Sequence, residues 1–432
     1  MRMVELFIFL GGLIAFFLLG FPVAISIGLT SIFYLIMQNG IGDIPFTMIA
    51  QRMLYGVNNF TILAIPLFLL TGKLMNSGKI THKLFGFANI LVGYLPGGLG
   101  HANVVASIIF AGMSGSAVAD SAGLGTIEIE AMDNEGYDRD FSAAVTAASS
   151  TIGPIVPPSI PAVMIGVMGN LSVSKLLIGG IIPGVLMGLS LMILIWYYSI
   201  KFKYPRKPLP TTKIIVSSFK EAFLPLLTPI ILVGGIITGW FTATEAAAVA
   251  AVYALVLSMF VYRTVKLADL WDIFKETLKD TSMILFIVAT ASLYGWLIVR
   301  AQLPIMISDK IVTLSQNPVV ILLIINAFLL IVGMFMESLA AITILTPILV
   351  PVVIKLGVDP IHFGVLMNLV LMIGLITPPL GVCLYAVSKV AKRPLGAVVR
   401  KTAPFYLPLL LVMLLITFFP KIITFLPNLL NR

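Results

Sequence analysis

The chain has 432 residues, of which 59% are hydrophobic and only 10% are charged. Soluble domains contain about 45–50% apolar and about 25% charged residues, so this composition excludes an ordinary soluble protein and predicts several membrane spans in a lipid bilayer. The formal net charge of +9 does not indicate a nucleic-acid partner, because the basic residues lie in short loops, as the positive-inside rule predicts.

Cysteine, histidine and nucleotide-binding patterns exclude several kinds of chemistry. Cys383 is the one cysteine, so no intrachain disulfide can form, and the three histidines share no metal-binding spacing. Residues 72–81 come nearest to a Walker A loop, but Ile80 stands where Ser or Thr is required. We therefore expect no cofactor and no enzyme, with an intramembrane enzyme as the least favoured class.

The first part of the chain predicts spans joined by basic loops. Residues 6–37 indicate two helices or one broken helix, divided near Gly20 and Pro22, and residues 60–72 indicate another span. Lys73 begins a basic loop that we expect to be cytoplasmic. The side chains of Arg52 and Lys73 could face a substrate path, although a membrane-flanking anchor is the commoner role. The N-terminal segment shows no convincing signal-peptide cleavage site, so we expect it to be retained.

Residues 84–131 predict a re-entrant helical hairpin. Its tip is expected at Ser114, Gly115 and Ser116, a small, hydroxylated cluster in the middle of apolar sequence. Carbonyl and hydroxyl oxygens at the ends of two half-helices can replace the hydration shell of Na⁺, and close helix packing is the alternative explanation. Asp120 lies in the same apolar context, where charges are costly and usually functional, although a hydroxyl-bonded structural carboxylate would also fit.

A broken helix is predicted at about residues 141–170. Residues 151–158 read Thr-Ile-Gly-Pro-Ile-Val-Pro-Pro, and a helix does not continue through such a run, because proline lacks an N–H and glycine weakens a helix. Irregular backbone at membrane depth is tolerated only where protein buries it or where it lines a wet cavity. Ordinary proline kinks are the alternative.

The same break returns in the second half of the chain. At an offset of 221 residues, seven positions between residues 136 and 158 have an identical partner. Paired Gly/Pro-interrupted segments in two halves indicate a transporter's binding site. We expect residues 1–200 and 221–432 to be two repeats joined by a basic cytoplasmic linker at 201–220. An odd number of crossings in each half would make the repeats inverted relative to one another.

The second half begins with a span, after which Thr244 is expected to cap a helix and Glu245 to lie in its first turn. Glu245 is thereby explained without a function. Residues 263–280 predict an interfacial amphipathic helix, followed by a separate span at 282–299. The last span is expected at residues 405–419.

Residues 318–356 predict a second hairpin with its tip at 333–338. This tip contains the acidic residue Glu337 and fewer hydroxyl residues than the first tip, so the two hairpins should not be chemically equivalent. A second broken helix is expected at about residues 361–390. The predicted fold is therefore an all-α polytopic membrane protein with two repeats, each containing a re-entrant hairpin and a broken helix.

Several motifs together resemble one known family. They are Leu63–Phe68 (LAIPLF), Ala111–Asp120 (AGMSGSAVAD), Gly136–Arg139 (GYDR), Ala147–Pro154 (AASSTIGP) with Pro157 and Pro158, Thr244–Ala248 (TEAAA) and Gly374–Pro379 (GLITPP). The chain resembles the large membrane subunit of tripartite ATP-independent periplasmic (TRAP) transporters, the DctM-like family. It departs from the family at residues 242–244, where a proline commonly precedes Thr-Glu-Ala, so the local cap geometry stays open.

The resemblance implies an elevator-type ion transporter fold, in which the hairpins and broken helices form a mobile transport domain held by a scaffold. It implies one Na⁺ site formed by Ser114, Gly115, Ser116, Gly153, Val156 and Pro157. A second Na⁺ site would be formed by Gly333, Glu337, Gly374, Ile376 and Thr377. The substrate region between the tips would comprise Ser114, Ser116, Asp120, Thr151, Pro158, Ser338 and Pro378.

The resemblance also implies partners and a task. Such subunits work in the bacterial cytoplasmic (inner) membrane with a small four-helix membrane subunit (DctQ-like) and a periplasmic solute-binding protein (DctP-like). They import a carboxylate, such as sialic acid or a C4-dicarboxylate, on a Na⁺ gradient. The chain lacks the additional N-terminal spans of fused members, each roughly 20 residues long, so we expect the small subunit to be a separate chain. A stand-alone Na⁺- or H⁺-coupled anion carrier is the alternative.

Overall fold

The computed structural model describes residues 2–78, 80–315 and 317–430, and all regular structure within these ranges is helical. The helices of the first half are α1 (Arg2–Leu18), α2 (Val23–Asn39), α3 (Phe46–Val57), α4 (Ala64–Ser77), α5 (Ile80–Val92), α6 (Gly98–Ser114), α7 (Ala117–Ala122), α8 (Leu124–Asn134), α9 (Arg139–Ser150), α10 (Ile160–Gly169), α11 (Val173–Gly179) and α12 (Ile181–Phe202). Those of the second half are α13 (Thr212–Ile237), α14 (Ala243–Val256), α15 (Leu267–Arg300), α16 (Leu303–Leu314), α17 (Pro318–Phe335), α18 (Ser338–Lys355), α19 (Pro360–Gly374), α20 (Val382–Ala391), α21 (Leu395–Phe418) and α22 (Lys421–Leu429).

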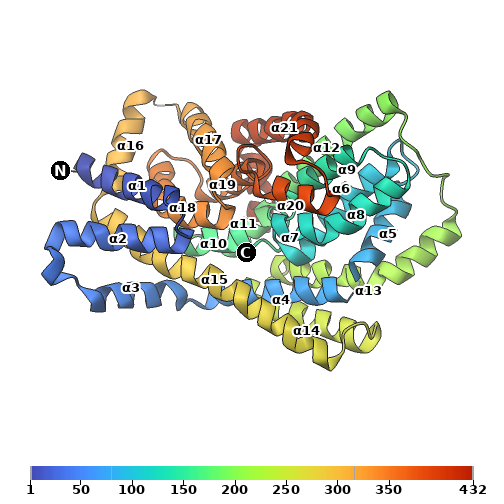
Figure 1. Ribbon diagram of the computed structural model, residues 1–432, viewed down its shortest axis with the longest axis horizontal. Helices are drawn as coiled ribbons and strands as arrows, with labels where there is room; N and C mark the ends of the chain where they lie inside the picture. The colour runs from blue at the N-terminus through green and yellow to red at the C-terminus, as the bar shows by residue number, and fades with distance from the viewer. Residues whose placement is uncertain (1, 79, 316, 431–432) are drawn as a thin grey trace.

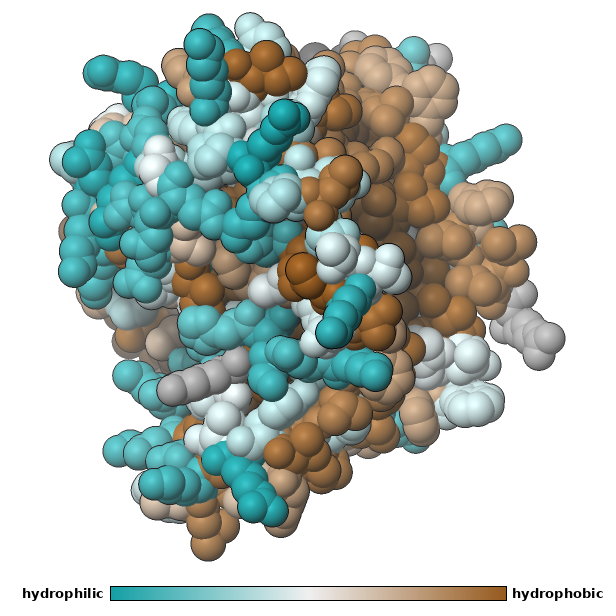
Figure 2. All heavy atoms as spheres, turned by 90° about the vertical axis from the view of Figure 1, so that its right-hand side faces the viewer, coloured by the Kyte–Doolittle hydropathy of each residue, from teal (hydrophilic) through white to brown (hydrophobic). Residues whose placement is uncertain are grey.

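Eight helical segments among the described residues are long and apolar enough to cross a membrane. Many of their large apolar side chains are exposed, as lipid contact requires; Ile193 is 69% exposed and Leu407 is 64% exposed. Figure 2 views the end of the molecule that carries the connection between α12 and α13, where hydrophilic residues gather on one side and a broad hydrophobic surface extends on the other. The all-α polytopic fold predicted from the sequence is confirmed.

The helices fall into two groups in Figure 1. The long helix α15 packs against α2, α3 and α4, and α14 packs against α4, along the lower side of that view. The helices α6 to α11 and α17 to α21 lie above them. The second group contains both hairpins and both broken helices, so the four irregular segments belong to one region of the fold.

Both predicted hairpins reverse at their expected tips. The helix α6 ends at Ser114, Gly115 adopts a left-handed conformation with φ of 59°, and Ser116 precedes α7 as its N-cap. This φ favours glycine, because a Cβ would be strained there. In the second hairpin, the Glu337 carboxylate caps α18 by accepting hydrogen bonds from the N–H groups of Leu339 (2.9 Å) and Ala340 (3.2 Å). A carboxylate thus takes the place of the hydroxyl found at the first tip.

Both predicted helix breaks are present at the proline pairs. The helix α9 stops at Ser150 and α10 starts after Ser159, while α19 stops at Gly374 and α20 starts after Gly381. Each break contains one cis peptide bond, between the two prolines of its Pro-Pro pair. The Ser159 hydroxyl donates a hydrogen bond to the Pro154 carbonyl oxygen within the first break. The same hydroxyl oxygen accepts a hydrogen bond from the Ala162 N–H (3.0 Å), so Ser159 is also the N-cap of α10.

Three local expectations are corrected. The N-cap of α14 is Thr242 and not Thr244: the Glu245 N–H donates to Thr242 Oγ1 (3.3 Å), and the Thr242 N–H donates to Glu245 Oε2 (2.8 Å).

The predicted interfacial helix at 263–280 is not separate, because α15 runs unbroken for 34 residues from Leu267. No proline or glycine interrupts the first part of that sequence, so the helix continues into the span. The helix α13 begins at Thr212, so the non-helical linker is shorter than the predicted one.

Replacing Thr242 with Ala should destabilise the protein by about 1 kcal/mol, because it removes a reciprocal capping interaction. Thr211→Ala is the matched control, since Thr211 is the N-cap of α13 but its side chain makes no cap hydrogen bond. Thermal unfolding in detergent should show a lower apparent Tm for Thr242→Ala alone. Equal effects of the two substitutions would contradict the assignment of the cap.

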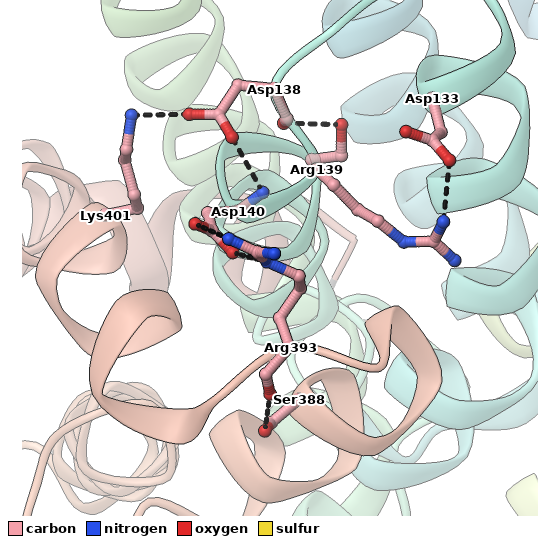
Figure 3. Close-up of polar contacts among 8 residues, drawn as sticks. Asp133, Asp138, Arg139, Asp140, Ser388, Arg393 and Lys401 are labelled. Atoms are coloured by element: carbon pink, nitrogen blue, oxygen red, sulfur yellow. Dashed lines mark hydrogen bonds and ion pairs between the residues drawn. The ribbon is translucent and has the colours of Figure 1, made fainter.

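A cluster of ion pairs joins the two halves of the chain at the start of α9 (Figure 3). Arg393, between α20 and α21, donates from Nε to Asp140 Oδ1 (2.5 Å) and from Nη2 to Asp140 Oδ2 (2.9 Å). Lys401 Nζ lies 2.5 Å from Asp138 Oδ2. Hydrogen bonds from the Arg393 guanidinium hold the pKa of Asp140 below its ordinary value, and Lys401 adds a smaller effect in the same direction. A two-bond contact of this kind is stronger than a single ion pair.

Arg393→Gln should therefore lower the apparent Tm of the protein in detergent, and the effect should be modest because the guanidinium is 44% exposed and screened. The ionised Asp140 stabilises the fold above its unfolded pKa of about 4, and this contribution is lost as the pH falls through its lower folded pKa. The difference in apparent Tm between the two proteins should therefore shrink on acidification.

Lys355→Gln is the control for this substitution. Its ion pair with Asp309 joins side chains that are 51% and 64% exposed, so its loss should change stability little. A difference in Tm between Arg393→Gln and the unaltered protein that stays constant from pH 7 to below pH 4 would contradict the role of the Asp140 carboxylate.

Candidate functional site

The first hairpin tip lies directly on the first helix break. A Cβ on Gly115 would lie only 2.7 Å from the carbonyl oxygen of Pro158 and 3.3 Å from the Ile160 nitrogen. The glycine is therefore required twice, by its left-handed φ and by the close approach of another backbone. This contact brings the first tip beside the Pro158 carbonyl of the first break.

The second tip lies on the second break in the same way. A Cβ on Gly374 would lie 2.5 Å from the Cα of Gly333, and one on Gly333 would lie 3.0 Å from the Cα of Gly374. The Leu380 N–H, within the break, donates to the Met334 carbonyl oxygen (3.3 Å). At the offset of 221, Gly333 and Gly374 match Gly112 and Gly153, whereas Gly115 and Pro158 match Met336 and Pro379. Each half therefore packs its tip against its own break, but through different residues.

The two halves meet at the centre of the site. Asn368, on α19, donates from Nδ2 to the Pro154 carbonyl oxygen of the first break (2.8 Å). Ser116 and Pro154 of the first half and Glu337 and Ser338 of the second line one small cavity of about 60 Å³. The two tips and the first break are therefore neighbours inside the protein.

A larger cavity of about 510 Å³ lies beside the tips and is lined by residues of both hairpins, α4 and α15. Ser114, Ser116 and Glu337 lie on its tip side, while Lys73 of α4 and Asp280 of α15 lie on the opposite side. Its size and the mixture of apolar and polar lining are typical of a site for a small molecule. The sequence did not indicate that Asp280 would face the tips, because the contact depends on how α15 packs against α4.

Asp120 belongs to the first tip and not to either cavity. The Ser114 hydroxyl donates to Asp120 Oδ1, and the other oxygen, Oδ2, has no hydrogen-bond partner. Oδ2 points at Gly153, since a Cβ there would lie 2.3 Å from it. A buried carboxylate oxygen without a partner is costly. The structure therefore groups Asp120 with the residues of the predicted first Na⁺ site, whereas the sequence had grouped it with the substrate region.

The remaining predicted residues fall into two sets. Ser338 lies at the second tip and lines the small cavity. Pro158, in the first break, lies against Gly115 of the first tip. Thr151, Val156, Pro157, Ile376, Thr377 and Pro378 lie within the breaks but line neither cavity. Among these, the Ile376 carbonyl oxygen accepts a hydrogen bond from the Tyr406 hydroxyl (2.8 Å), and the Thr377 hydroxyl donates to the Ile373 carbonyl (2.8 Å).

Sequence reasoning missed Asn368, Tyr406 and Asp280. Asn368 is a lone polar residue within the apolar run of α19, and a lone polar residue at membrane depth is a signal that could have indicated it. Nothing in the local sequence around Tyr406 distinguishes it from other aromatic residues in spans.

Gly374→Ala should reduce transport at least about tenfold, because the added Cβ would collide with the backbone of Gly333 and separate the second tip from its break. Gly396→Ala is the matched control, since a Cβ at this helical position meets no atom within 4 Å. Uptake into proteoliposomes, normalised to the amount of inserted protein, measures the effect. Near-normal uptake by Gly374→Ala would contradict the close tip-on-break contact.

Comparisons with known proteins identify the family. The model of the family described as "Tripartite ATP-independent periplasmic transporter, DctM component" matches residues 10–422. The sialic acid TRAP transporter large permease protein SiaM of Vibrio cholerae is 46% identical over 410 residues, which cover 95% of each chain. The C4-dicarboxylate TRAP transporter large permease protein DctM of Pseudomonas aeruginosa is 40% identical and is aligned over 88% of this chain and 89% of its own.

Two further similarities concern length and fold. The sialic acid TRAP transporter permease protein SiaT of Haemophilus influenzae is 43% identical, and the aligned region covers 88% of this chain but only 62% of SiaT. The crystal structure of the Alcanivorax borkumensis YdaH transporter has a TM-score of 0.62 at 15% identity and covers 87% of this chain and 88% of its own, which shows a shared fold. The chain therefore belongs to the DctM component family of TRAP transporters and is a large membrane subunit that crosses the bacterial inner membrane several times.

Proposed function

We propose that this chain is the translocating subunit of a TRAP transporter that imports an organic acid together with Na⁺. The carboxylate class follows from the relatives, whose names give sialic acid and C4-dicarboxylates as cargo. The observation that carries the proposal is the pair of tip-on-break contacts, Gly115 on Pro158 and Gly333 on Gly374. Unwound backbone of this kind, inside a membrane protein, supplies oxygen ligands for a cation.

The proposed first Na⁺ site comprises the Ser114 and Ser116 region with Gly153, Val156 and Pro157. Two features support it: the glycine at the tip gives the backbone a close approach, and Asp120 Oδ2 is aimed at Gly153 without a partner. A bound cation beside this oxygen would offset the cost of burying it. The proposed second site comprises Gly333, Glu337, Gly374, Ile376 and Thr377, and the close contact of Gly333 with Gly374 supports it.

The cargo would lie between the tips, in the larger cavity beside Ser116 and Glu337. Na⁺ on both sides would offset the repulsion between a carboxylate cargo and Glu337. This arrangement gives a physical reason for coupling, because the anion gains affinity only after the cations have bound. In the elevator mechanism that we propose, α6 to α11 and α17 to α20 would carry cargo and ions together past α4, α14 and α15.

We further propose that a periplasmic solute-binding protein delivers the cargo and that a small four-helix membrane subunit completes the scaffold. The family description names a tripartite, periplasmic system, which supports both partners. A stand-alone anion carrier remains the second candidate, and the neighbouring genes discriminate between the two. Neighbours that encode a secreted binding protein and a small four-span protein would favour the tripartite system.

Uptake of labelled sialic acid or succinate into proteoliposomes that contain both membrane subunits should require an inward Na⁺ gradient and the loaded binding protein. Replacing the Na⁺ gradient with a K⁺ gradient should abolish accumulation. Equal rates under both gradients would refute Na⁺ coupling, and equal rates without any binding protein would favour the stand-alone carrier.

Ser114→Ala should raise the half-saturating Na⁺ concentration by about tenfold. The substitution removes the Ser114 hydroxyl, which donates to the Asp120 carboxylate and is a proposed oxygen ligand of the ion. Ser190→Ala is the control, because the Ser190 hydroxyl only donates to the Met187 carbonyl of its own helix (2.8 Å). The Na⁺ dependence of uptake measures both. An unchanged Na⁺ dependence in Ser114→Ala would remove Ser114 from the ion site.

A further inference from the structure

An ion pair faces the hairpin tips across the larger cavity. Lys73 Nζ, on α4, lies 2.6 Å from Asp280 Oδ2 and 3.5 Å from Glu276 Oε2, both on α15. Lys73 and Asp280 line the same cavity as Ser114 and Glu337. The pair therefore belongs to the wall that opposes the tips.

The position of Lys73 is fixed by a close contact of α4 with the first tip. The preceding residue, Gly72, has no side chain, and a Cβ there would lie 3.2 Å from the Met113 carbonyl oxygen and 3.3 Å from the Ser114 Cα. The backbone of α4 thus touches the tip at the residue next to Lys73. Asn76, one helical turn further along, lines the same cavity and adds a neutral donor to this face.

The pair is open to solvent and easy to exchange. The side chain of Lys73 is 22% exposed, that of Asp280 45% and that of Glu276 71%. Ion pairs of this exposure contribute little to stability, because water and salt screen them. Another carboxylate that entered the cavity would therefore displace Asp280 at small cost.

The charges of the cavity make such an exchange useful. Among the described residues that line it, Lys73 is the one cation, and Asp280 and Glu337 are acids. An anionic cargo released from the tips would have Glu337 behind it and Asp280 in front of it, and would be repelled by both unless a cation received it. Lys73 is the one group placed to do this, and its pairing with Asp280 keeps it in place while the cavity holds no cargo.

We propose that Lys73 is a cargo-binding residue of the opposing wall, which receives a carboxylate group of the cargo by exchanging it for Asp280. This inference rests on the proposed function, since it requires a carboxylate cargo. The exchange involves no covalent step: the Lys73 ammonium leaves one carboxylate and binds another, and Asp280 becomes hydrated. Asp280 is thus a competing internal anion that sets how tightly the cargo is held at this wall.

The test is an exchange assay with the complete complex in proteoliposomes. Labelled sialic acid, or succinate in a parallel series, is supplied outside the vesicles on the binding protein. Only transporter complexes whose periplasmic side faces outward can receive cargo from the binding protein, so the assay reports on that orientation alone. The interior contains unlabelled cargo at increasing concentration. The half-saturating internal concentration then reports the affinity for cargo that enters from the inner side, where the basic loop that begins at Lys73 is expected to lie.

Lys73→Gln should raise the half-saturating internal concentration about tenfold, whereas Lys73→Arg should stay within about threefold of the unaltered complex. Asp280→Asn should lower the half-saturating internal concentration, because the Asp280 carboxylate no longer competes with the cargo for Lys73. Lys83→Gln is the matched control, as Lys83 stacks over the Tyr262 ring at 4.3 Å and lines a different pocket. The half-saturating Na⁺ concentration should not change in any of these variants.

Two outcomes would overturn the inference. The first is a half-saturating concentration for Lys73→Gln and Asp280→Asn within twofold of the unaltered complex. The second is an equal rise in the half-saturating internal concentration for Lys83→Gln, which would show that the effect does not depend on the position of the lost positive charge. Loss of Na⁺ dependence in the unaltered complex would instead refute the proposed function, so the two failures are distinguishable.

Discussion

The fold depends on one constraint, which is that the hydrocarbon core offers no hydrogen bonds to an unwound backbone. In this membrane protein two helices nevertheless stop, one at Ser150 and one at Gly374, and the next helices start only after Ser159 and Gly381. Each broken segment is covered by the tip of a hairpin, and glycines at the contacts let backbone approach backbone. The breaks and the tips therefore stabilise one another, and neither would be tolerated alone.

The two halves share this plan but differ in chemistry. The first tip presents Ser114 and Ser116 and holds Asp120 behind them, whereas the second tip is capped by the Glu337 carboxylate. Asn368 of the second half binds the first break, so the halves are joined at the site itself, and the Asp140–Arg393 pair joins them again at the start of α9. These contacts hold the parts of the region together, as the proposed elevator mechanism requires.

Much of this plan could be predicted from the sequence because its causes are local. Proline and glycine end helices wherever they occur, so the breaks at 151–158 and 372–379 and the tip at Ser114–Ser116 followed from residue type and spacing. Contacts between distant segments could not be predicted in this way. The pairing of Lys73 with Asp280, the orientation of Asp120 Oδ2 towards Gly153 and the hydrogen bond from Tyr406 to Ile376 depend on packing between helices. The cap at Thr242 was missed because Thr244 also precedes Glu245.

The most direct test of the account is a high-resolution cryo-electron microscopy map of the complete complex, recorded once in NaCl and once in choline chloride. The account predicts interrupted helices at both proline pairs and, in NaCl alone, density enclosed by backbone oxygens at each tip-on-break contact. Continuous helices through either region, or identical density in the two salts, would contradict it.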